Sequence, residues 1–275
     1  MDYEAEYDTR ARVPEHLAII EGWLNDSAAY RQAASCELDV RYGEAPRMTY
    51  DLFRPAGPAD AAAALVMFIH GGYWYSRTPK DFSHLAAGLN KRGLVAAMPG
   101  YTLCPDTTVA GIVEELRQAA AELWRRFGRR IVVTGHSAGG HLTATTVATD
   151  WTAVERGLPG DLARRGLAIS GLFDLAPMLD TSLNQHLRLD AEAARAASPV
   201  EWEPPAGVSL QAAVGGAESS EFLRQSRALV AAWGRNGAEM RFRAVDGANH
   251  FTVIAELTDP GSRMVDDLVA MAGAG

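Results

Sequence analysis

Short apolar runs alternate with longer amphipathic stretches along most of this chain. Residues 64–69, 94–98 and 131–133 are almost continuously apolar, which is typical of strands buried on both faces of a sheet. Residues 106–127 instead repeat apolar side chains at helical spacing, which predicts an amphipathic helix with Asp106 as its N-cap. Strands that alternate with helices predict a mostly parallel sheet covered by helices on both faces.

The first 58 residues have a different pattern. Residues 14–34 predict a helix, and residues 36–42 and 47–53 alternate apolar and polar side chains, which predicts an antiparallel hairpin. A loop with two prolines and a glycine, residues 55–58, follows. The expected apolar face of the helix consists of Leu17, Ile20, Trp23 and Leu24.

The second half of the chain continues the alternation up to its end. Residues 174–207 are predicted to be irregular, with short helices between prolines. Whether this segment forms a mobile lid remains open. No internal repeat, low-complexity tract or long linker interrupts the pattern, so we predict one α/β domain over residues 1–275, with about eight strands. Further strands are predicted at residues 166–170, 208–214 and 239–245, and further helices at residues 80–91, 219–235 and 260–271.

A strand–turn–helix transition at residues 131–148 carries the first candidate chemistry. Residues 135–139 read Gly-His-Ser-Ala-Gly, the G-x-S-x-G pattern of a nucleophile on a tight, strained turn. A Cβ at Gly135 or Gly139 would collide with the adjoining strand or helix. The helix that follows directs free N–H groups at the reaction centre, where negative charge develops. We therefore predict Ser137 as a nucleophile.

A serine nucleophile needs a general base, and the base needs an acid that fixes its tautomer. After a G-x-S-x-G serine, the acid and then the histidine are expected on loops that follow later strands. His250 and Glu218 satisfy that order, since each comes just after a predicted strand. Two other acids remain open: Glu221 could lie on the next helix, and Asp246 shares the loop of His250.

The other histidines are weaker candidates for the base. His16 and His84 occupy predicted helices and are expected on the surface. His136 and His141 flank the serine, and we expect them to be part of its scaffold.

The loop after the third predicted strand begins His-Gly-Gly and suits an oxyanion hole. Backbone N–H groups that no side chain shields can approach the oxyanion of a tetrahedral intermediate. Gly71 or Gly72 would donate one hydrogen bond and Ala138 another. Tyr73 and Trp74 follow directly, and either are buried aromatics or wall a substrate pocket.

The composition and net charge limit the classes of molecule that the chain is expected to bind. Among 275 residues, 34 are acidic and 26 are basic, which gives a net charge of −8 and disfavours nucleic acid or an anionic membrane as a partner. Cys36 and Cys104 have no metal-like spacing, and no apolar run reaches the length of a membrane span. The acidic N-terminus lacks the apolar core of a signal peptide. We expect a cytoplasmic protein with a small-molecule substrate and no metal or cofactor; a homodimer remains open.

With these residues placed, the chain resembles the kynurenine formamidase (arylformamidase) branch of the α/β-hydrolase superfamily, close to the hormone-sensitive-lipase-like esterases. Residues 70–74 resemble its H-G-G-Y-W signature, and residues 135–142 resemble its G-H-S-A-G-G-H-L. Residues 221–226 resemble the helix after its acid, and His250-Phe251 its histidine loop. The branch usually has aspartate where this chain has Glu218, and the longer glutamate requires a loop set slightly further back.

The resemblance implies an α/β-hydrolase fold, with Ser137 as nucleophile, Glu218 as acid and His250 as base. It implies an acyl-enzyme mechanism that hydrolyses an N-formyl aryl amide, such as N-formylkynurenine, to formate and an aryl amine. Two alternatives remain. One is a carboxylesterase for short-chain esters. The other is a non-catalytic ligand-binding protein of the same fold, against which an intact serine, acid and histidine argue.

Overall fold

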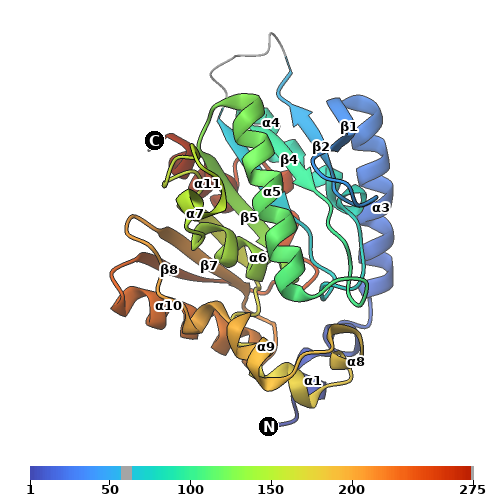
Figure 1. Ribbon diagram of the computed structural model, residues 1–275. Helices are drawn as coiled ribbons and strands as arrows, with labels where there is room; N and C mark the ends of the chain where they lie inside the picture. The colour runs from blue at the N-terminus through green and yellow to red at the C-terminus, as the bar shows by residue number, and fades with distance from the viewer. Residues whose placement is uncertain (57–63, 274–275) are drawn as a thin grey trace.

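The strands form one sheet in the computed structural model, which describes residues 1–56 and 64–273. In these residues the sheet has eight strands in the order β1-β2-β4-β3-β5-β6-β7-β8 (Figure 1). The pairs β1–β2 and β2–β4 are antiparallel, and the other pairs are parallel. The predicted fold class is confirmed. The strands are β1 (Ser35–Arg41), β2 (Thr49–Arg54), β3 (Leu65–Ile69), β4 (Val95–Pro99), β5 (Ile131–His136), β6 (Arg165–Ile169), β7 (Ser209–Gly215) and β8 (Glu239–Val245).

Helices cover both faces of this sheet, as the alternation of strands and helices predicts. The α-helices are α1 (Tyr3–Tyr7), α2 (Thr9–Arg12), α3 (His16–Ala33), α4 (Ala86–Lys91), α5 (Val109–Phe127), α6 (Ala138–Val147), α7 (Trp151–Val154), α8 (Asn184–Leu187), α9 (Ala191–Ala196), α10 (Ser220–Arg235) and α11 (Arg263–Gly273). Single 3₁₀ segments are η1 (Pro79–Leu85), η2 (Ala176–Asp180), η3 (Pro199–Glu201) and η4 (Val253–Thr258).

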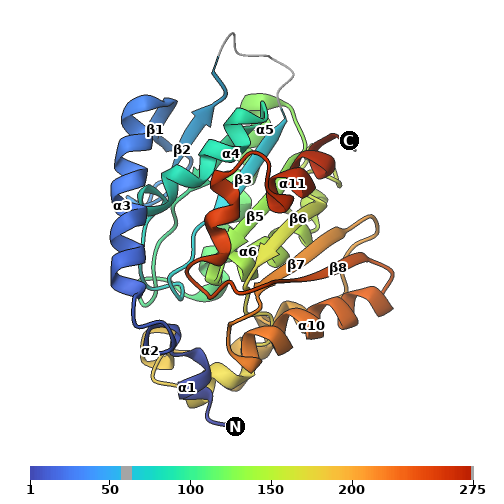
Figure 2. The same ribbon diagram turned by 180° about the vertical axis from the view of Figure 1, so that it is seen from behind.

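Two hydrophobic cores lie on opposite faces of the sheet. Met67 and Val133 point into the core beneath α5, α6 and α10, whereas Val66 and Val132 point into the core beneath α4 and α11. Figure 2 shows α3, α4 and α11 together on the second face. The central strands are buried on both sides, which is why they read as continuous apolar runs.

Two local expectations need correction, and a third lies partly outside the described residues. The helix α5 begins at Val109, because the Thr108 hydroxyl, and not Asp106, caps it by accepting from the Gly111 N–H at 3.0 Å. The predicted helix at residues 80–91 is divided into η1 and α4. Of the predicted loop at residues 55–58, Gly57 and Pro58 lie outside the described residues.

The expected apolar face of α3 is only partly right. Ile20 is buried, but Leu17 and Leu24 are exposed to 70% and 42%. The helix packs on η1 instead through a face that includes Ser27, whose hydroxyl lies 2.7 Å from Nδ1 of His84. This contact buries His84, so its predicted surface position is wrong.

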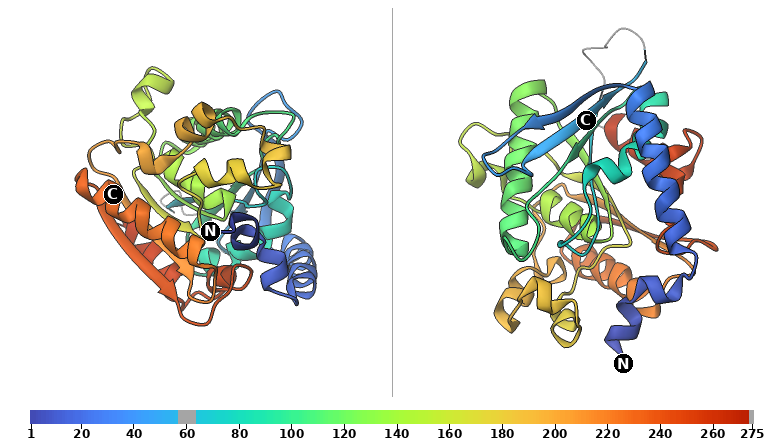
Figure 3. Two further views of the ribbon diagram at one scale, coloured as in Figure 1. Left: turned by 90° about the horizontal axis from the view of Figure 1, so that it is seen from below. Right: turned by 90° about the vertical axis from the view of Figure 1, so that its right-hand side faces the viewer.

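The parallel strands end at the edge where the N-terminal helices lie. Figure 1 shows α1 beside α8, and the left view of Figure 3 shows α1 and α2 next to the segment at residues 174–207. Contacts of α1 with α10 and η2 agree with this placement. In parallel α/β sheets, ligands bind outside the carboxyl ends of the strands. No helix of the described residues is long and apolar enough to cross a membrane.

Candidate active site

The candidate nucleophile lies on a sharp turn between β5 and α6. Ser137 has φ 60° and ψ −121°, a strained conformation for a residue with a side chain. A Cβ on Gly139 would lie 2.0 Å from the Ile69 carbonyl oxygen, and one on Gly135 would lie 2.4 Å from the Gly139 carbonyl oxygen. The Ser137 N–H donates to the Ile169 carbonyl at 2.8 Å. Glycine is therefore required on both sides of this serine, as predicted.

The structure brings His250 and Glu218 together. Nδ1 of His250 lies 2.6 Å from Oε2 of Glu218, and both side chains are buried. Because a carboxylate only accepts hydrogen bonds, Nδ1 carries the proton and Nε2 is left as a base. Oε1 of Glu218 accepts from the Ser170 hydroxyl at 2.5 Å and from the Gly215 N–H at 2.7 Å. These donors fix the carboxylate that orients the imidazole.

The two alternative acids lie elsewhere. Glu221 is fully buried in the first turn of α10, where Oε1 accepts from the Tyr7 hydroxyl at 2.6 Å and Oε2 from Arg224 Nε at 2.7 Å. Asp246 is exposed, and within the described residues its carboxylate makes no hydrogen bond with His250. Glu218 alone of the three contacts the candidate base.

A small cavity of about 50 Å³ lies at Ser137 and His250. We call it the nucleophile cavity. In the part of the chain that the structure describes, the two side chains are not hydrogen-bonded to each other, and such bonds are often long in ligand-free sites. The cavity is lined by Thr9, Arg10, Trp23, Gly71, Gly72, Tyr73, Ser76, Arg77, Phe82, His136, Ser137, His250 and Phe251.

The Gly-Gly loop passes against the nucleophile. A Cβ on Gly71 would lie 2.6 Å from the His136 carbonyl oxygen and 2.9 Å from Ser137 Cβ, so only glycine allows this approach. Gly72 has a φ of +108°, which also favours glycine. Among the described residues, the N–H groups of Gly72 and Ala138 have no hydrogen-bond partner. They are available to a ligand.

His70 and Tyr101 hold this loop from behind. The two rings stack at 4.2 Å, and the Tyr101 hydroxyl donates to the His70 carbonyl at 3.0 Å. Nδ1–H of His70 donates to the Gly71 carbonyl at 2.7 Å. Burial lowers the pKa of His70 to about 3, so its imidazole is neutral at pH 7. His70 is a structural support for the Gly-Gly loop.

The aromatic pair after the loop divides into two roles. Both residues have positive φ, 49° for Tyr73 and 60° for Trp74, so the chain turns sharply here. Tyr73 lines the nucleophile cavity, but Trp74 is fully buried and packs edge-on against His141. Of the two alternatives left open for this pair, Trp74 is the buried aromatic, because the turn directs its indole into the core, and only Tyr73 lines the cavity.

The histidines that flank the serine are buried, as the scaffold prediction requires. Burial, aided by the neighbouring His250, holds the pKa of His136 well below its usual range, and its ring lies 4.6 Å from that of His250. His141 donates from Nε2 to the Ala197 carbonyl at 2.7 Å, and burial lowers its pKa to about 4. Neither adds positive charge beside the candidate base.

Sequence analysis missed the N-terminal wall of the site. Thr9 and Arg10 of α2 line the nucleophile cavity, together with Trp23 of α3. The only local signals were Asp2 and Asp8, whose carboxylates cap α1 and α2 by accepting the N–H group three residues later. Such caps predict short helices, but they do not indicate what those helices cover.

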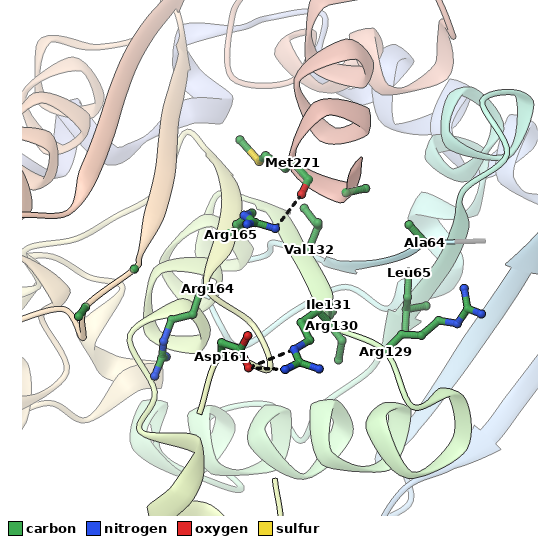
Figure 4. A pocket seen from close by; sticks show the side chains of 13 residues that line it. Ala64, Leu65, Arg129, Arg130, Ile131, Val132, Asp161, Arg164, Arg165 and Met271 are labelled. Atoms are coloured by element: carbon green, nitrogen blue, oxygen red, sulfur yellow. Dashed lines mark hydrogen bonds and ion pairs between the residues drawn. The ribbon is translucent and has the colours of Figure 1, made fainter. Parts of the chain in front are cut away.

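A larger cavity, about 590 Å³, lies at the opposite edge of the sheet, where β3 and β5 begin (Figure 4). Its arginines point in different directions. Arg130 pairs with Asp161, and Arg164 donates to the Val147 and Thr149 carbonyls. Its described lining includes no serine, threonine or cysteine, and it lies at the amino ends of the parallel strands, away from the ends at which ligands bind in such sheets. Among the described residues, no group of three or more His, Cys, Asp or Glu side chains could hold a metal ion.

Comparisons with known proteins show which proteins the chain is similar to. A family described as "alpha/beta hydrolase fold" matches residues 66–203. Kynurenine formamidase of Danio rerio is 29% identical, over 88% of this chain and 84% of its own length. The crystal structure of a candidate thioesterase from Silicibacter sp. has a TM-score of 0.89 and 34% identity, and covers 98% of this chain and 99% of its own. An esterase from Thermogutta terrifontis shares the fold at 22% identity and a TM-score of 0.64, over 80% of this chain and 85% of its own.

Proposed function

Because the chain belongs to the α/β-hydrolase fold family, we propose that it is a serine hydrolase that releases formate from an N-formyl aryl amide such as N-formylkynurenine. The observation that carries this proposal is the buried Glu218–His250 pair beside Ser137, with 2.6 Å between Oε2 and Nδ1. We assign the acyl group to the cavity at Ser137, where formyl, the smallest acyl group, needs the least space. Similarity to kynurenine formamidases over 88% of the chain supports the same substrate class.

In the proposed reaction, Ser137 Oγ attacks the formyl carbon while its proton passes to Nε2 of His250. Glu218 keeps the other ring nitrogen protonated and stabilises the imidazolium that forms. His250 then returns the proton to the departing aryl amine, which leaves poorly as an anion. Water, activated by the same imidazole, attacks the formyl-enzyme and releases formate.

The oxyanion of each tetrahedral intermediate is assigned to backbone donors. Ala138 offers the first N–H group of α6, and Gly71 or Gly72 offers a second from the facing loop. Their N–H groups are fixed before substrate arrives, so they need no reorganisation in the transition state. Support comes from the contact distances at Gly71, which place this loop directly against the nucleophile.

A turnover screen tests the proposal. We expect kcat/KM to be higher for N-formylkynurenine than for p-nitrophenyl acetate, despite the better leaving group of the ester. Among p-nitrophenyl esters, kcat/KM should fall from acetate to butyrate, because each methylene crowds the nucleophile cavity. Preference for butyrate, with no formate released from N-formylkynurenine, would contradict the formamidase proposal.

Hydrolysis of short-chain esters or thioesters is a second candidate. It is favoured by the 34% identity to the candidate thioesterase, which extends over nearly the whole of both chains. The same site would serve, since the acyl-enzyme and the oxyanion are common to all of these acyl transfers. An acetyl thioester added to the screen separates the two candidates.

A further inference from the structure

A second cavity adjoins the nucleophile cavity and shares Thr9, Arg10 and Tyr73 with it. It measures about 180 Å³, and we call it the outer cavity. With the acyl group in the nucleophile cavity, we assign the leaving amine to the residues that the two cavities share. Their side chains are thus placed to contact the part of the substrate that departs.

Arg10 is the cation at this junction. Its side chain is exposed, and within the described residues its guanidinium, which has five N–H donors, makes no hydrogen bond and no ion pair. The nucleophile cavity contains Arg10 and Arg77 but no aspartate or glutamate, and Arg77 lies 3.7 Å from the Asp81 carboxylate. A carboxylate on the substrate would therefore find its free partner in Arg10.

The outer cavity, unlike the nucleophile cavity, is lined by acidic side chains. Glu4 and Asp8 line it, and the ring of Tyr73 faces that of Tyr75 at 6.4 Å. Both oxygens of Glu4 accept hydrogen bonds from Ser182. One oxygen of Asp8 caps α2 through the Ala11 N–H at 2.9 Å, which leaves its second oxygen free. Carboxylates and aromatic rings attract cations, so these residues favour an ammonium group as ligand.

The segment that presents these charges is firmly docked. The Tyr7 hydroxyl donates to Glu221 at 2.6 Å, and Glu221 pairs with Arg224; we call these three residues the anchor. The Tyr73 hydroxyl donates to the Tyr7 carbonyl at 2.6 Å and is also bonded by Thr9. A buried carboxylate destabilises the fold unless it is paired. The pairing of Glu221 with Tyr7 and Arg224 therefore holds the two short helices α1 and α2 in place.

From these observations we propose that the junction binds a zwitterionic α-amino-acid group on the leaving amine, with its carboxylate on Arg10 and its ammonium on Asp8. The inference rests on the proposed function and specifies its substrate class. Opposite charges on two residues of one docked segment would select an amino-acid head over a neutral one. Both act through binding, and neither takes part in the chemical step.

Three aryl formamides test this assignment. N-Formylkynurenine has both charges, 4-(2-formamidophenyl)-4-oxobutanoate has only the carboxylate, and 2′-formamidoacetophenone has neither. Arg10→Gln should lower kcat/KM for the first two by about 10- to 100-fold, chiefly through KM. Asp8→Asn, which retains the cap, should lower only the first, by about 3- to 10-fold. For the neutral formamide, which lacks both charges, the loss in kcat/KM should be smaller than for N-formylkynurenine in both variants.

Arg10→Lys and Arg156→Gln are the controls. The first keeps the charge and should retain most of the activity on the charged substrates; the second removes an exposed arginine in the turn after α7 and should change nothing. Equal kcat/KM on all three formamides in wild type, or equal losses on all three in Arg10→Gln, would overturn the inference alone. No formate from any of the three would overturn the proposed function, and this inference with it.

Discussion

Two glutamates three residues apart, both buried, serve different regions of the molecule. Glu218 belongs to the proposed catalytic region with Ser137 and His250, where it contacts the Nδ1 atom of the candidate base at 2.6 Å. Glu221 belongs to the anchor, where its partners are a permanent cation and a phenol. The role of a buried carboxylate therefore depends on its partners, and not on burial or residue type.

The sharpest test of this contrast is Glu218→Gln. An amide cannot stabilise the imidazolium and favours the wrong tautomer of His250, so kcat should fall by about 10³- to 10⁴-fold. The fold should persist, because the amide can still accept from Ser170 and Gly215. Initial rates of formate release and the thermal midpoint measure both effects. A variant that keeps more than about a tenth of the activity would remove Glu218 from the catalytic region.

The catalytic region also differs from the anchor in its dependence on pH, because it is backed by buried neutral histidines. Burial lowers the pKa of His141 to about 4 and that of His70 to about 3, whereas an unfolded histidine titrates near 6.5. Between these values the unfolded chain binds more protons. Stability is therefore complete above about pH 6.5 and falls as the pH drops towards 4.

Each of these two histidines should make the unfolding free energy about 2 kcal/mol lower at pH 5 than at pH 7. Urea midpoints at the two pH values measure the sum. His141→Gln keeps a donor for the Ala197 carbonyl but does not titrate, so its stability should depend less on pH. Equal pH dependence in the variant and the wild type would show that His141 does not contribute.

Glu221→Gln should affect the anchor and spare the chemistry. The substitution leaves Arg224 with Asp174 as its remaining carboxylate partner, and we expect a loss of about 1–3 kcal/mol in unfolding free energy. Turnover of the neutral formamide should stay within about 5-fold, since the contacts of His250 are unchanged. Chemical denaturation measures the loss of stability, and initial rates measure the turnover. A loss of kcat as large as that of Glu218→Gln would mean that the two glutamates share one role.

Tyr7→Phe is the mildest change to the anchor. Burial, with Glu221 beside it, raises the pKa of Tyr7 far above its ordinary value, so the hydroxyl is always a donor. Its removal should cost about 0.5–1.5 kcal/mol, because Arg224 and Gln225 still bind the carboxylate. Thermal unfolding measures this loss. Tyr73→Phe, which removes the donor to the Tyr7 carbonyl, is a matched comparison on the other side of the segment.

Features that depend on residues close together in the sequence could be predicted, whereas contacts between distant residues could not. The serine turn depends on glycines within two residues, and a buried strand shows itself as an apolar run, so both were predictable. Glu218 and His250 were found because each follows a strand, and parallel strands end at one edge of the sheet. These features are local, or follow from the order of elements.

The rest depends on contacts that no local pattern reveals. Tyr7 and Glu221 are 214 positions apart, and nothing near either residue indicates the other. Tyr73 and Trp74 are adjacent aromatics that a single backbone turn sends to a cavity and to the core. His84 lies in a helical stretch but is buried, because Ser27 of a distant helix binds its ring.

The central claim is that Ser137 is the nucleophile, and covalent labelling tests it most directly. The protein should react with a fluorophosphonate probe, and peptide mass spectrometry should place the adduct on Ser137. Ser137→Ala should take up no probe, and its kcat should fall by on the order of 10³-fold or more, although the fold and oxyanion donors remain. An adduct on another residue, or formate release by Ser137→Ala at the wild-type rate, would contradict the account.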